Sequence, residues 1–160
     1  MKRLILIRHA SALPEQFPGK DIDRSLSGEG IREAQSLAGI LLEKNHLPEV
    51  LLCSPAERTI STARIIRDAF PPELIRIQPS PLLYNAGFHT ISGQIEKLPA
   101  SMQTVGIVGH NPGISQLATV LSAAYPYQFS TAACLCMEFP VNEWKSIQNG
   151  SGKEIWYYCP

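Results

Sequence analysis

The sequence predicts an α/β fold with a mostly parallel central sheet and an antiparallel C-terminal edge. Short apolar runs at residues 4–7, Val50–Cys53 and Thr104–Gly109 are each followed by a stretch with helical spacing. Strands that are apolar on both faces are typical of central parallel strands covered by helices. Residues 131–139 and 153–159 are also strand-like but have no helix between them, so we expect them to pair antiparallel at one edge.

Length and composition favour one soluble domain spanning residues 1–160. The chain is 44% hydrophobic, and its 14 basic residues balance its 14 acidic ones, so no global field points to nucleic acid or to an anionic membrane. The N-terminal apolar run is too short for a secretory signal, and we expect a cytoplasmic protein with reduced cysteines. Cys134 and Cys136 are interpreted as core thiols, because no matching pair of ligands makes a zinc site.

The first half of the chain shows clear helix boundaries. A long Pro-, Gly- and charge-rich loop covers residues 11–26, and loops of this length are often functional. We expect a helix from Ser27 that ends near Asn45, with His46 as a helix-end residue. Ser54 is expected to cap a second helix, because Glu57 completes a capping box after Pro55.

The second half repeats the pattern. We expect a third strand at residues 74–77 and a helix at residues 89–98. After the strand Thr104–Gly109, Asn111 is expected to cap a further helix that starts at Pro112.

Cation-capable side chains follow three of these predicted strands. Arg8 and His9 end the first, Arg58 lies in the first helical turn after the second, and His110 follows the third. Ligands of open α/β sheets bind at the carboxyl ends of the strands, and helix N-termini favour anions. Arginine matches phosphate oxygens in bidentate fashion, and a neutral imidazole is a nucleophile near pH 7. The pattern therefore predicts a phosphoryl-binding site that needs no metal and no cofactor.

Three motifs carry a resemblance to a known family. L-I-R-H-A at the N-terminus, S-P-A-E-R-T-I-S-T-A at residues 54–63 and G-H-N-P-G at residues 109–113 resemble the signature blocks of the histidine phosphatase superfamily. D-I-D-R-S-L-S-G-E-G, P-L-L-Y and E-F-P-V-N-E-W are similar to its small, SixA-like phosphohistidine phosphatase branch. The resemblance implies a phosphoglycerate mutase-like three-layer α/β/α sandwich with no large cap, and a role in signal transduction.

The resemblance also implies roles for individual residues. His9 would be the phosphorylated nucleophile, Arg8, Arg58 and His110 would complete the phosphate pocket, and Arg24 would help to bind substrate from the loop above. The implied partner is a protein phosphohistidine. A small phosphorylated molecule is the alternative substrate, and a phosphate-binding pseudoenzyme is the non-enzyme alternative.

One position departs from the family pattern. Asn85 follows Tyr84 where related sequences often carry Glu, the general acid of larger members. An amide cannot donate a proton as an acid does, whereas an imidazole leaving group has a conjugate-acid pKa of only about 6.5. The departure favours a phosphoramidate substrate, unless a substitute acid comes from Asp21, Asp23 or His89. Alternatively, Asn85 is not the structural equivalent of that acid.

Overall fold

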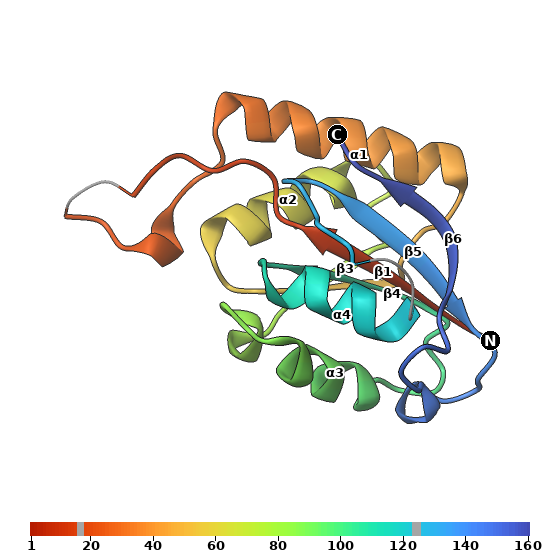
Figure 1. The fold of residues 1–160 in the computed structure, drawn as a ribbon. Coiled ribbons are helices and arrows are strands. Elements are labelled where there is room, and N and C mark those ends of the chain that lie inside the picture. Colours follow the sequence, from red (N-terminus) through yellow and green to blue (C-terminus); the bar gives the residue numbers. More distant parts are fainter. Residues whose placement is uncertain (16–17, 123–125) are drawn as a thin grey trace.

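A mixed β-sheet lies between two layers of helices. The computed structural model describes residues 1–15, 18–122 and 126–160. Helices α1 and α2 cover one face of the sheet, and α3 and α4 cover the other (Figure 1). The three-layer α/β sandwich without a large cap is therefore confirmed. The helices are α1 (Gly28–Lys44), α2 (Glu57–Asp68), α3 (Phe88–Glu96) and α4 (Gly113–Ser122), with short 3₁₀ turns η1 (Asp21–Asp23), η2 (Pro81–Leu83) and η3 (Trp144–Ser146).

The sheet has the order β3-β2-β4-β1-β5-β6 within the described residues. Strands β3, β2, β4 and β1 are parallel, β5 pairs antiparallel with β1, and β6 pairs antiparallel with β5. The antiparallel C-terminal edge is thus confirmed. The strands are β1 (Lys2–Arg8), β2 (Val50–Cys53), β3 (Arg76–Pro79), β4 (Thr104–Gly109), β5 (Cys134–Phe139) and β6 (Lys153–Tyr158).

Strand β1 separates the two cores of the molecule. Leu4 and Leu6 pack into the core below α3 and α4, whereas Ile5 and Ile7 pack into the core under α1 and α2. All four are fully buried, and each contributes about 1.5–3 kcal/mol relative to exposure. Alternation along a strand that is buried on both faces explains the unbroken apolar run.

The register of the central strands places their carboxyl ends next to one another at one edge of the sheet. Arg8 at the end of β1 pairs with Gly109 at the end of β4, and Cys53 at the end of β2 pairs with Val108. The residues that follow these strands therefore emerge side by side. Among the described residues, none of the helices is both long and apolar enough to cross a bilayer.

Two helix boundaries agree with the sequence and two caps do not. Ser27 caps α1 by accepting a hydrogen bond from the Gly30 amide at 3.0 Å, and α1 ends at a left-handed Asn45 with φ of 52°. The predicted capping box at Ser54 is wrong, because α2 begins only at Glu57 and no side chain caps it. The Asn111 side chain does not cap α4 either. Its amide donates to the Phe129 carbonyl and its oxygen accepts from the Ser115 hydroxyl.

The remaining boundary errors are small. The third strand lies at Arg76–Pro79 rather than at residues 74–77, and α3 ends at Glu96. β5 begins at Cys134, since the three residues before it form a turn in which Ala132 has a positive φ of 55°.

Candidate active site

Arg58 is the centre of a cluster at the carboxyl edge of the parallel strands. It is the second residue of α2, and only 4% of it is exposed. Its Nε donates to Nε2 of His9 at 3.3 Å, and its Nη2 lies 3.4 Å from Nδ1 of His110. The two imidazole rings meet edge to face with centroids 5.1 Å apart. The structure thus brings together three of the side chains predicted from sequence.

His9 is held in one tautomer. Its Nδ1 lies 2.8 Å from the carbonyl oxygen of Ala10, and because a carbonyl can only accept, Nδ1 must carry the proton. Nε2 is then unprotonated, and its lone pair accepts the Arg58 Nε–H. Burial, with the nearby arginines, lowers the pKa of His9 to about 4, so the ring is neutral at physiological pH. A neutral imidazole with an unprotonated Nε2 is the form that can act as a nucleophile.

His110 is fixed from the opposite side by Ser54. Its Nε2 lies 2.8 Å from the Ser54 Oγ, and that oxygen also accepts from the Ala56 amide. Burial, together with the neighbouring His9 and Arg58, lowers the pKa of His110 to about 3. Ser54, expected from sequence to cap the helix, therefore orients a histidine of the site instead.

Arg8 lies at the edge of this cluster. Its Nη1 donates to the Phe129 carbonyl at 2.8 Å, which the Asn111 amide also contacts at 2.9 Å. Its Nε is buried and has no hydrogen-bond partner among the described residues. A buried guanidinium N–H without a partner is costly, so Arg8 has a donor available for an incoming anion.

Asp21 connects the long loop to the cluster. Its Oδ2 accepts from Arg58 Nη2 at 3.0 Å and from the Tyr84 hydroxyl at 2.7 Å, while its Oδ1 accepts from Arg24 Nη1 at 3.0 Å. The hydrogen bond from Tyr84, with those from Arg24 and Arg58, holds the pKa of Asp21 well below its usual range. Asp21 is therefore a carboxylate at neutral pH, and it cannot supply a proton there.

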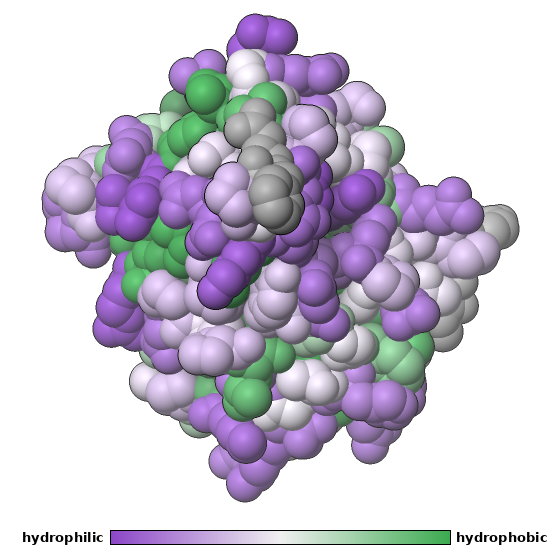
Figure 2. Space-filling model, turned by 90° about the vertical axis from the view of Figure 1, so that its left-hand side faces the viewer, coloured by the Kyte–Doolittle hydropathy of each residue, from purple (hydrophilic) through white to green (hydrophobic). Residues whose placement is uncertain are grey.

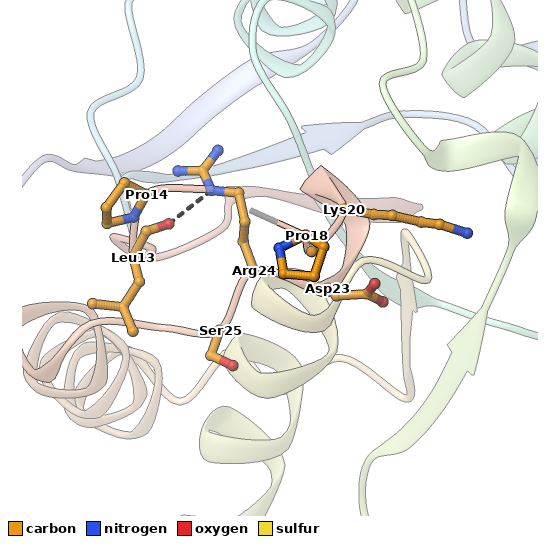
Figure 3. Close-up of a pocket in the computed structure, with 8 residues that line it drawn as sticks. Leu13, Pro14, Pro18, Lys20, Asp23, Arg24 and Ser25 are labelled. Carbon is orange, nitrogen blue, oxygen red and sulfur yellow. Dashed lines mark hydrogen bonds between the residues drawn. The ribbon is translucent and has the colours of Figure 1, made fainter. Parts of the chain in front are cut away.

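Arg24 contacts the loop rather than the histidines. Its Nε donates to the Leu13 carbonyl at 2.7 Å, as Figure 3 shows, and it lines a hollow of about 310 Å³ between the two arms of the loop. The hollow is lined by Leu13, Pro14, Pro18, Gly19, Lys20, Asp23, Arg24 and Ser25. Figure 2 views the end of the molecule from which this loop projects, where hydrophilic side chains predominate between smaller apolar patches.

The other candidates for a proton donor lie outside the cluster of hydrogen bonds. Asp23 is exposed and lines the hollow, and His89 is exposed on α3 with its ring 3.9 Å from that of Phe88. Asn85 is also exposed and has a positive φ of 48°, a conformation that Asn tolerates better than most residues. The backbone thus supplies a reason for Asn at this position that is independent of chemistry.

The cysteines that suggested an alternative metal site lie in the core. Cys134 and Cys136 are fully buried, which confirms them as core thiols, and burial raises the pKa of both. Across residues 1–15, 18–122 and 126–160, no group of three or more His, Cys, Asp or Glu side chains is arranged to hold a metal ion. His46 follows α1 as expected, and it accepts a hydrogen bond from the Trp156 indole at 2.8 Å.

Two site residues were missed from the sequence. Tyr84 contacts Asp21, and its ring lies edge-on to His110 with centroids 5.7 Å apart. Its signal was its position in the segment that follows β3, directly after η2, because the strand-end rule already applied to the other strands. Glu33 lies on α1 and contacts Ser11 in the loop after His9. Its signal in the sequence was that an acidic residue stands directly before Ala34, which lies on the buried face of an amphipathic helix.

Comparison with known proteins gives consistent relatives. Residues 4–117 match the model of the histidine phosphatase superfamily (branch 1). An uncharacterized protein of Mycobacterium leprae is 36% identical over 168 residues, which cover 96% of this chain and 99% of the relative. A structure assigned as the phosphohistidine phosphatase SixA of Agrobacterium tumefaciens has a TM-score of 0.83 at 26% identity, covering 99% of this chain and 98% of that one. A SixA structure complexed with tungstate shares the fold, with a TM-score of 0.81 at 22% identity over 98% of this chain and 96% of that one.

Proposed function

The chain belongs to the histidine phosphatase superfamily, and from that premise we propose that it is a metal-independent phosphatase that acts on protein phosphohistidine through a phosphorylated His9. The observation that carries the proposal is the position of Arg58 between Nε2 of His9 and Nδ1 of His110. This arrangement sets a neutral nucleophile beside a fixed positive charge, which is what phosphoryl transfer to a side chain requires.

The proposed reaction has two steps. The lone pair on Nε2 of His9 attacks phosphorus in line, and the bond from phosphorus to the leaving nitrogen breaks. The substrate imidazole leaves as the neutral ring because its other nitrogen carries a proton, and the proton on Nδ1 of His9 stays where it is. Water then attacks the phosphorus on His9, the P–Nε2 bond breaks, and phosphate is released. Arg58 and Arg8 would hold the equatorial oxygens, because both guanidinium groups reach this edge of the sheet and Arg8 has a buried donor without a partner.

Among the described residues, the cluster holds no side chain suited to donate a proton at neutral pH, which favours a phosphoramidate over an ester. An alkoxide leaving group needs a proton, whereas imidazole leaves with a conjugate-acid pKa of about 6.5. Asp21 is the nearest carboxyl to Arg58, and the lowered pKa that its three hydrogen-bond donors produce makes it a poor acid at neutral pH. Asn85 offers an amide instead of a carboxyl. A protein-borne phosphohistidine fits this site on chemical grounds.

The test compares three substrates at equal concentration: a phosphohistidine-carrying protein, a small phosphoramidate and a phosphomonoester. We expect turnover of the first two and little of the third. Preference for the phosphomonoester would favour the alternative of a small-molecule phosphatase, and binding without turnover of any substrate would favour the pseudoenzyme. Asn85→Asp restores a carboxyl in a residue that tolerates positive φ, and it should raise phosphomonoester turnover selectively if position 85 can hold the acid.

The covalent step has its own test. A labile phosphodonor should label His9 in an acid-labile, base-stable form, and His9→Ala should lose both the label and turnover while it remains folded. Turnover by an unlabelled wild-type protein would contradict the covalent mechanism. Retained activity in His9→Ala would place the nucleophile on another residue.

A further inference from the structure

Glu33 anchors the segment that follows His9. Its Oε2 accepts from the Ser11 amide at 2.8 Å, and its Oε1 accepts from the Ser11 hydroxyl at 2.9 Å and from the Thr131 hydroxyl at 3.0 Å. The α1 helix packs closely against this segment at Gly30, because a Cβ on Gly30 would overlap the Ser11 carbonyl. None of these contacts touches the phosphate pocket directly.

A single peptide group connects Glu33 to His9. The Ala10–Ser11 peptide uses its carbonyl to accept from Nδ1 of His9 at 2.8 Å, and it uses its N–H to donate to Glu33 at 2.8 Å. Hydrogen bonds in a chain polarise one another, so an N–H that donates to a carboxylate makes the carbonyl of the same peptide a better acceptor. The carboxylate therefore acts on the imidazole through one peptide plane.

We propose that Glu33 is a positioning residue for His9: through the Ala10–Ser11 peptide it holds the imidazole in its Nδ1–H tautomer with Nε2 free for attack. The inference rests on the proposed function for its catalytic consequence. When Nε2 of His9 bonds to phosphorus, the ring keeps its Nδ1 proton and gains positive charge, and the polarised Ala10 carbonyl stabilises that charge. Carboxylates that orient histidine ligands act in a comparable way, and their loss typically costs about 10- to 100-fold in activity.

Glu33 also acts on Arg8, the residue before His9. Burial lowers the pKa of Arg8, and Glu33 acts in the opposite direction on it. The charges that act on the His9 ring are those of Arg58, Arg8 and Arg24, so Glu33 affects His9 through the Ala10–Ser11 peptide and through Arg8. Glu33 is thus an acidic group that acts on the end of β1 from α1.

The test uses Glu33→Gln, because an amide can meet the same three partners through one carbonyl and one NH₂ but carries no charge. Glu29→Gln is the matched control, since it removes the same charge from an exposed position of the same helix. Ser11→Ala is the second control: it removes one hydroxyl contact to Glu33 and leaves the amide contact in place. All three variants are compared with wild type by ¹⁵N NMR of the His9 ring and by single-turnover phosphorylation.

In wild type we expect the Nδ1–H tautomer of His9. In Glu33→Gln the Nε2–H tautomer should become detectable, and His9 phosphorylation should slow about tenfold with little change in KM. Glu29→Gln and Ser11→Ala should match wild type in both readouts. The inference is overturned if wild-type His9 is an Nε2–H tautomer, if Glu33→Gln matches Glu29→Gln, or if Ser11→Ala loses as much as Glu33→Gln, which would indicate mere anchoring. The tautomer measurement needs no turnover, so a wild type that never becomes phosphorylated would refute the proposed function separately.

Discussion

Replacing Gly30 and Gly39 with alanine should change the free energy of unfolding in opposite directions, although both residues lie in α1. A Cβ on Gly39 meets no atom within 4 Å, so Gly39→Ala gains only helix propensity, about 0.5–1 kcal/mol. A Cβ on Gly30 would overlap the Ser11 carbonyl oxygen and lie 2.8 Å from its carbon and 2.9 Å from the Ser11 nitrogen. The loop must therefore move away from α1.

The magnitude for Gly30→Ala follows from the contacts that this movement stretches. The Ser11 oxygen accepts from the Ser27 amide at 2.9 Å and the Ser27 hydroxyl at 3.3 Å, and the Ser11 amide donates to Glu33 at 2.8 Å. At about 1 kcal/mol for each of these three contacts, less a gain of about 0.5–1 kcal/mol in helix propensity, Gly30→Ala should lose about 2–2.5 kcal/mol.

Thermal unfolding at pH 7.5, followed by circular dichroism, measures both variants against wild type. For a domain of this size about 1 kcal/mol corresponds to about 2–4 °C in Tm. We therefore expect the Tm of Gly30→Ala to fall by about 4–10 °C and that of Gly39→Ala to rise by about 1–4 °C. Because Ser11 follows His9 and Ala10 directly, Gly30→Ala should also lose activity while Gly39→Ala retains it. A Gly30→Ala protein as stable as wild type would refute the close approach of α1 to the loop.

Three further predictions concern the chemistry of the site. Ser54→Ala removes the acceptor of both His110 Nε2 and the Ala56 amide, so we expect a loss of about 1–3 kcal/mol in urea unfolding, and an unchanged midpoint would contradict the buried contact. Burial lowers the pKa of His9 to about 4 and of His110 to about 3, so the unfolded chain binds more protons once the pH falls below about 6.5. Stability from these histidines should be complete above pH 7 and should be lost as the pH falls from about 6.5 towards 4, and His110→Asn should flatten the dependence of Tm on pH. Treatment with a chelator should leave phosphatase activity unchanged, and a large loss would restore a metal-dependent mechanism.

The convergence of Arg58, His9 and His110 could be predicted because it depends on topology. The carboxyl ends of parallel strands lie at one edge of the sheet. The residues that follow β1, β2 and β4 therefore come close together, because the register places the ends of these strands next to one another. The apolar runs, the helical spacing and the antiparallel strands at the end of the chain were sufficient to predict this topology. The strand-end rule placed the side chains without any knowledge of their contacts.

Individual hydrogen bonds could not be predicted in the same way. Ser54 fits a capping box locally, but in the fold its hydroxyl bonds to His110, which lies 56 residues away in the sequence. Asn111 likewise bonds to the Phe129 carbonyl rather than to the next helix. Local propensity competes with tertiary partners that the sequence does not show, and at the site the tertiary partners prevail. The contacts of Tyr84 with Asp21 and of Glu33 with Ser11 are tertiary in the same way.

Asp21 has a consequence for which anions can occupy the site. In the resting protein its carboxylate already neutralises Arg58 and is held by three donors, from Arg58, Tyr84 and Arg24. An entering anion must compete with this internal one. Chloride brings one charge and no directional oxygens, whereas a phosphoryl group brings a charge of about −1.5 to −2 and three acceptor oxygens. The site therefore disfavours chloride, because a ligand must interact with the arginines more strongly than the Asp21 carboxylate does before it can bind.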